Sequence, residues 1–196
     1  VPMYFFSIVI MLLTFVFAGM LVHRSRMAKS HQLIDATATA NWVFLGSKIL
    51  ALLKVQLLLL LVMMFCGIGL QIYNGFYQFE IDLYLFHLFI ITFPTLVTWA
   101  ALSVFINTIV PNMYMGIFLL LLIWIGKDQL PQIGIETPLL RFNSPPQLVY
   151  SDLNGFGHGL LSNVIINIYW LIFSAILIVV THLFWERGYY YSIKER

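Results

Sequence analysis

Four long stretches without Asp, Glu, Lys or Arg constrain the fold of this chain more than any other feature. They cover residues 1–22, 55–79, 83–126 and 153–185. A helix needs roughly 20 consecutive apolar residues to cross a bilayer, and each stretch is long enough. Hydrophobic residues make up 61% of the chain and charged residues only 9%, whereas about a quarter of the residues in a soluble domain are charged. The sequence therefore predicts an all-α, multi-pass membrane protein.

The stretch 83–126 is too long for one span, and it contains the turn residues Pro111 and Asn112. Because proline interrupts a helix, we expect two spans here with a tight turn between them. The whole chain, residues 1–196, is then one transmembrane domain with five spans. Their expected positions are about 1–22, 49–69, 85–108, 113–126 and 163–185.

The basic residues set the expected orientation. Residues 23–54 and the C-terminal tail after Trp185 hold most of the Lys and Arg side chains, and four spans separate the two segments. Both segments therefore lie on one face, which the positive-inside rule assigns to the cytoplasm. We expect the N-terminus of the chain outside and the C-terminus inside. The chain starts at full hydrophobicity without an initiator Met, so we also expect the natural protein to continue upstream of Val1.

Two segments between spans are predicted to have structure of their own. Residues 24–41 have a helical apolar pattern and are followed by Trp42, an aromatic residue of the kind that anchors a chain at the membrane interface. We expect a short cytoplasmic amphipathic helix, which either lies on the lipid surface or docks on a cytoplasmic partner. The Pro-rich loop 127–162 is expected outside, as a folded cap or a partly re-entrant segment.

Polar residues inside the spans are few. No acidic residue and no pair of opposite charges is expected at mid-membrane, which argues against a proton- or sodium-coupled carrier. Pro94 is expected to kink the third span. Most of the remaining polar positions are expected to form hydrogen bonds between helices, and a few to line a substrate path: Thr92, Thr95, Thr98, Asn107 and Asn167.

The sequence lacks the motifs of several common nucleotide-binding and metal-binding sites. The chain has no G-x-x-x-x-G-K-[ST], no H-E-x-x-H and no C-x-x-C, so we expect no P-loop, none of the commonest zinc patterns, and no catalytic, metal or cofactor residues. No basic patch is interleaved with aromatics, which argues against nucleic acid. His23 and His182 near one face, and His87 and His158 near the other, leave a haem-binding redox protein as an alternative, although side chains at span ends are more typical of interfacial histidines. A non-transporting membrane anchor is a further alternative.

Three segments resemble one family. "RMAKSHQLIDATATANWVFLGSKILALL" (26–53), "VYSDLNGFGH" (149–158) and "YWLIFSAILIVVTHLFWERG" (169–188) are similar to the transmembrane permease of ABC-type exporters of the second class, of the bacterial kind sometimes associated with a zinc aminopeptidase domain. The family pattern has Glu at the position of Gln32 and Pro at the position of Ala38. The first departure removes a charge that could contact a partner, and the second lets the helix extend.

The resemblance implies a mechanism. Such permeases have six spans in each half, so this chain would supply the second to the sixth, in the bacterial inner membrane. The helix 24–41 would be the coupling helix, pushed by a separate ATP-binding subunit, and a second permease half or a second copy would complete the transporter. The residues that the resemblance assigns to the contact with the ATP-binding subunit are Arg26, Lys29, His31, Gln32, Leu33, Ile34 and Asp35.

Overall fold

The computed structural model describes residues 2–27, 40–75, 77, 81–146, 148, 157 and 159–185, with only the backbone described for 2–5 and 25–27. All the regular secondary structure within these residues is helical. The long helices are α1 (Pro2–Met27), α3 (Asn41–Tyr73), α5 (Phe93–Ile109), α6 (Met113–Gln129) and α7 (Gly159–Phe184). Shorter elements are α4 (Ile81–Leu85), the π-helical η1 (Phe86–Thr92) and the 3₁₀ turn η2 (Leu130–Ile133).

Five helical stretches are long and apolar enough to cross a membrane, which confirms the expected number: Phe6–Arg24, Asn41–Tyr73, Ile81–Ile109, Met113–Ile133 and Gly159–Phe184. The chain is a multi-pass, all-helical membrane protein in its described part. The structure differs from the expected bounds mainly at the second span, which begins at Asn41 instead of residue 49. The last helix begins four residues earlier than expected, at Gly159.

Two prolines lie at interruptions of the regular α-helical pattern. Pro111 and Asn112 separate α5 from α6, and the Asn112 side chain caps α6 by accepting a hydrogen bond from the Tyr114 backbone N–H at 3.0 Å. Pro94 follows directly after the π-helical turn. There the backbone N–H of Phe93 and the hydroxyl of Thr92 donate five residues back, to the carbonyls of Leu88 and His87. The wider turn absorbs the hydrogen bond that proline cannot make.

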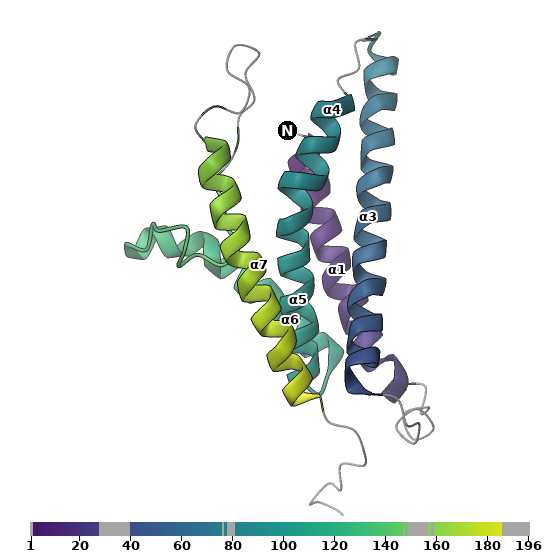
Figure 1. The fold of residues 1–196 in the computed structure, drawn as a ribbon, viewed down its shortest axis with the longest axis vertical. Helices are drawn as coiled ribbons and strands as arrows, with labels where there is room; N and C mark the ends of the chain where they lie inside the picture. The colour runs from purple at the N-terminus through teal and green to yellow at the C-terminus, as the bar shows by residue number, and fades with distance from the viewer. Residues whose placement is uncertain are drawn as a thin grey trace, which may run out of the picture.

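Helix α5 occupies the centre of the bundle, with α1 on one side and α7 on another (Figure 1). Its side chains contribute to one large apolar cluster with α1, α3 and α7. Val104 joins a smaller cluster nearer the end of the bundle at which α1 finishes, which we call the Met27 end. The chain passes from α1 to α3 at this end, and α7 also finishes here (Figure 1). Two basic segments, one after α1 and one after α7, thus leave the bundle at the same end, as the span count predicts.

Helix α6 does not run parallel to the others. It starts at the Met27 end, where a Cβ added at Gly19 of α1 would lie 2.8 Å from Met113 Cγ. It then passes obliquely behind α5 and α7, and its far end projects from the side of the bundle (Figure 1). The direction of α6 decides where the following loop lies.

Candidate functional site

The Met27 end of the bundle is held together by aromatic and cationic contacts. The ring of Trp42, in the first turn of α3, stacks on His182 near the end of α7, with 4.1 Å between ring centroids. Lys48 of α3 places its Nζ 4.5 Å from the ring centroid of Trp185 and 3.4 Å from the Val22 carbonyl of α1. We call these five residues the end clamp. It ties α1 and α3, the two helices joined by segment 28–40, to the end of α7.

Most of the predicted coupling residues lie in the segment next to this clamp, outside the described part of the chain. Arg26 belongs to the last turn of α1, so the first residues of the expected 24–41 helix continue the first span. Lys29, His31, Gln32, Leu33, Ile34 and Asp35 lie outside the described residues. Trp42 stands at the start of α3, where the sequence predicts an interface anchor, and 48% of its surface is exposed.

A second region lies in the middle of the bundle, where the chain after η2 folds back between helices. Phe142 packs its ring at 4.9 Å from both Trp99 of α5 and Trp170 of α7, measured between ring centroids. Trp99 in turn meets Phe15 of α1 at 5.3 Å. This aromatic series runs across three helices, and its central member comes from a loop. These contacts pack the described part of the loop around Phe142 against α5 and α7.

Two asparagines fasten the same segment. Asn143 Nδ2 donates to the Thr95 carbonyl at 2.7 Å, and Asn163 Nδ2 of α7 donates to the Pro146 carbonyl at 2.8 Å. Thr95 is the central residue of the 29-residue helical stretch Ile81–Ile109. Asn143 is therefore held at mid-height of the bundle. Its backbone φ of 48° lies in the left-handed region, which asparagine tolerates better than most residues.

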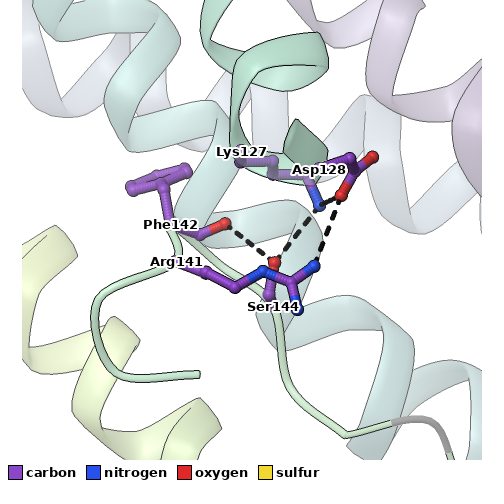
Figure 2. Close-up of polar contacts among 5 residues, drawn as sticks. All are labelled: Lys127, Asp128, Arg141, Phe142 and Ser144. Atoms are coloured by element: carbon purple, nitrogen blue, oxygen red, sulfur yellow. Dashed lines mark hydrogen bonds and ion pairs between the residues drawn. The ribbon is translucent and has the colours of Figure 1, made fainter. Parts of the chain in front are cut away.

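Charged side chains surround the start of this segment. Lys127 Nζ lies 3.4 Å from Asp128 Oδ1 and 3.4 Å from the Ser144 hydroxyl oxygen, and Arg141 Nη2 lies 3.7 Å from the same Asp128 oxygen. Figure 2 shows the Phe142 ring turned away from this group, towards the helices, while Arg141 and Ser144 face Lys127 and Asp128. We call Lys127, Asp128, Arg141 and Ser144 the charged cluster.

From the sequence, Lys127 and Arg141 are expected in an outside loop. The structure places them beside Ser144, the neighbour of the mid-height residue Asn143. The physical reason is the oblique course of α6, which ends level with the middle of α7 (Figure 1). Sequence hydropathy carries no information on helix tilt.

The polar residues predicted to join helices behave differently from the expectation. The Thr92, Thr95 and Thr98 hydroxyls and the Asn107 Nδ2 donate to carbonyls of their own helical stretch, and Asn167 Nδ2 donates to Asn163 Oδ1 on the same helix. The expectation of interhelical bonds is wrong for these donors. Back-bonding to a carbonyl three to five residues earlier satisfies a donor without needing a neighbouring helix.

A polar contact between spans comes instead from a residue that the sequence analysis missed. Gln56 of α3 is 1% exposed, and its Nε2 donates to Thr14 Oγ1 of α1 at 3.1 Å and to the Leu96 carbonyl of α5 at 3.0 Å. The available signal was an amide at the start of the long apolar run 55–70. A carboxamide there is costly in lipid, so it marks the face of α3 that turns inward.

The described residues contain no group of three or more His, Cys, Asp or Glu side chains that could hold a metal ion. Of the histidines weighed as haem ligands, His182 stacks on Trp42 and His158 lies outside the described residues. None of the contacts above favours the redox alternative.

Comparison with known proteins gives no relative to set beside this geometry: no family model, no curated protein and no solved structure matches the chain.

Proposed function

We propose that the chain is the transmembrane permease subunit of an ATP-driven ABC-type transporter that works as an exporter. A separate ATP-binding subunit hydrolyses ATP and pushes the segment 24–41, and this chain carries no catalytic site of its own. A second permease half, or a second copy of the chain, completes the pathway. The resemblance of residues 26–53, 149–158 and 169–188 to such permeases supports this proposal.

The end clamp is the observation that carries the proposal. Trp42 and Lys48 contact the last part of α7, and Lys48 also reaches the α1 carbonyl of Val22. A push on the segment between α1 and α3 would therefore act on three helices as a unit. Rigid movement of packed helices is one of the ways in which a local contact becomes a large conformational change.

The proposed membrane is the bacterial inner membrane, with the Met27 end in the cytoplasm. The bias of Lys and Arg towards residues 23–54 and the C-terminal tail supports this orientation. A reporter enzyme fused after Arg196, active only in the cytoplasm, is the direct measurement. Activity only for a periplasmic reporter at that position would reverse the topology.

Docking of the ATP-binding subunit is tested by charge reversal in the full-length protein. We expect the double variant Arg26→Glu, Lys29→Glu to insert normally but to lose most copurification of an ATP-binding subunit from native membranes. Lys54→Glu is the matched control, because Lys54 is an exposed basic residue of α3 outside the segment. Equal copurification by all three proteins would contradict the coupling role. Absence of any ATP-binding subunit from the wild-type preparation would contradict the transporter proposal itself.

A further inference from the structure

One polar segment lies on the side of the bundle, at a height where the other spans would meet lipid. Residues 129–141, which we call the side arm, continue from the outer end of α6, level with the middle of α7 (Figure 1). The last of them, Arg141, is two residues from Asn143, whose side chain is bonded to the central residue of the stretch Ile81–Ile109. The side arm is therefore far from both ends of the spanning helices.

The backbone of the side arm is unsuited to lipid. After α6 ends at Gln129, the chain forms the 3₁₀ turn η2 and then continues to Arg141 in turns and irregular backbone. Lipid tails cannot hydrogen-bond to backbone N–H and C=O groups. Irregular backbone at membrane depth is therefore found only where protein covers it or where it lines a water-filled cavity.

The side chains of the arm decide between protein and water. Ile133 is 72% exposed and Leu140 is 69% exposed, while Gln132 and Glu136 are exposed between them. Large apolar side chains are unfavourable in water, and the carboxamide and carboxylate are unfavourable in lipid. A surface that mixes the two kinds of side chain suits a contact with another protein chain.

The charges of the arm indicate which chain this is. Glu136 forms no ion pair with the described residues, and an unpaired carboxylate at this height is costly. Arg141, which lies 3.7 Å from Asp128, keeps 25% of its side chain exposed. A guanidinium is the preferred partner of a carboxylate. In a two-fold contact the same segment supplies both members, because residue 136 meets residue 141 and residue 141 meets residue 136.

We propose that the side arm forms a two-fold contact with a second copy of this chain, in which Glu136 of each copy pairs with Arg141 of the other. Ile133 and Leu140 are then buried against the partner copy, and the irregular backbone is covered by protein. This inference rests on the proposed transport function. It makes the second permease half a second copy of the chain and assigns the surface through which the two copies meet.

Photo-crosslinking in native membranes identifies what covers the arm. Replacing Ile133 of the full-length protein by p-benzoylphenylalanine should give a product with twice the mass of the chain. The same replacement of Ile172 is the matched control, because Ile172 is a similarly exposed isoleucine on α7. It should give no such product. A product with a different protein, no product at position 133, or equal amounts of dimer from both positions would overturn the contact.

Charge reversal tests the ion pair. Glu136→Arg and Arg141→Glu should each weaken the dimer of the purified full-length protein by about tenfold or more, since each removes two symmetry-related pairs. Co-expression of the two variants should restore the dimer, because the new arginine of one copy meets the new glutamate of the other. An ion pair within one chain cannot be restored in this way. The dimer fraction is measured by native mass spectrometry from nanodiscs.

Glu136→Gln at its exposed position serves if Arg141→Glu does not fold, and it should also weaken the dimer about tenfold. Asp82→Arg is the matched control for Glu136→Arg, because Asp82 is an exposed acid on α4, and it should leave the dimer unchanged. Dimers of Glu136→Arg and Glu136→Gln as stable as the wild type, or an equal loss in Asp82→Arg, would overturn the pair.

Copurification of an ATP-binding subunit is scored separately, so that the two proposals fail separately. A dimer that depends on Glu136 but brings no ATP-binding subunit would remove the transport role and keep the contact. An ATP-binding subunit on a protein that shows no dimer through the side arm would overturn the contact and keep the transporter.

Discussion

Helices α5 and α6 are neighbours in the chain, and each has 17 residues, most of them apolar, yet α5 is largely buried and α6 largely exposed. Ten residues of α5 are buried, and only Gly116 and Leu120 of α6 are. The buried face of α5 mixes small and polar residues with large ones, among them Ala100, Ala101 and Ser103. Small residues let helices approach closely where lipid removes the usual hydrophobic drive for packing.

Helix α6 has large side chains on most of its surface, and its close approach to α5 is near its beginning. A Cβ on Gly116 would overlap Asn107 Oδ1 of α5, whereas a Cβ on Gly126 near the other end would meet nothing within 4 Å. Apolarity thus determines that both helices enter the membrane, while small and polar residues determine which one lies at the centre. The following changes test this distinction, in order of expected effect.

Trp99 and Trp124 give the largest contrast between the two helices. Trp99 is 4% exposed and contacts Phe15 and Phe142, whereas Trp124 is only partly buried. We expect Trp99→Ala to lower the free energy of unfolding by about 3–5 kcal/mol, the usual range for a buried aromatic, and Trp124→Ala by clearly less. Titration with sodium dodecyl sulfate in detergent micelles, followed by circular dichroism, measures both. Equal losses would show that α6 is packed as firmly as α5.

Gly116→Ala and Gly126→Ala form a matched pair within α6. The new methyl at position 116 would lie 3.0 Å from Asn107 Cγ, and Asn107 is held by its bond to the Ser103 carbonyl. We expect a loss of about 1–3 kcal/mol from overpacking. Gly126→Ala adds a methyl in open space and should stabilise the helix by roughly 0.5–1 kcal/mol. The sign of the change in unfolding free energy decides the matter; a loss at Gly126 equal to that at Gly116 contradicts the close contact.

The contrast also explains what the sequence could and could not predict. The number of spans follows from the charge-free stretches, and Pro111 with Asn112 identifies the break between α5 and α6, because both signals are local. The height of the charged cluster in the bundle is not determined by a local sequence signal. Lys127 and Arg141 have the sequence context of a loop, and only the tilt of α6 brings them beside Ser144 at mid-height.

Side-chain partners were the least predictable part of the candidate site. Thr95 was expected to bond to another helix through its side chain; the structure uses its backbone carbonyl instead, as the acceptor for Asn143. Such a choice depends on which loop returns to the bundle, and no pattern in either segment records it. The coupling residues of 28–39 stay a prediction, since they lie outside the described residues.

Asn143 tests how firmly the loop segment that carries Phe142 is fastened to α5. Asn143→Gly keeps a residue suited to the positive φ of 48° and removes the hydrogen bond to Thr95, so we expect a loss of about 1 kcal/mol. Asn143→Ala removes the same bond and adds left-handed strain, which costs roughly 1 kcal/mol more. Unfolding titrations of the two variants separate the bond from the strain. Variants as stable as the wild type would mean that the Phe142 ring contacts and the Asn163 bond to the Pro146 carbonyl hold the segment without Asn143.

Gln56 gives the smallest expected change in stability and the sharpest test of why a buried amide is kept. In Gln56→Leu, neither former partner is stranded, because the Thr14 hydroxyl still donates to the Ile10 carbonyl and the Leu96 carbonyl remains part of α5. The Gln56 Oε1, which is buried without a hydrogen-bond partner, disappears as well. Replacing a polar side chain by an apolar one of similar size is then close to neutral, within about 1 kcal/mol. A larger loss would show that the amide holds α1, α3 and α5 together. Neutral stability with loss of ATP-dependent export would instead indicate that Gln56 acts in the conformational change of transport and not in the stability of the fold.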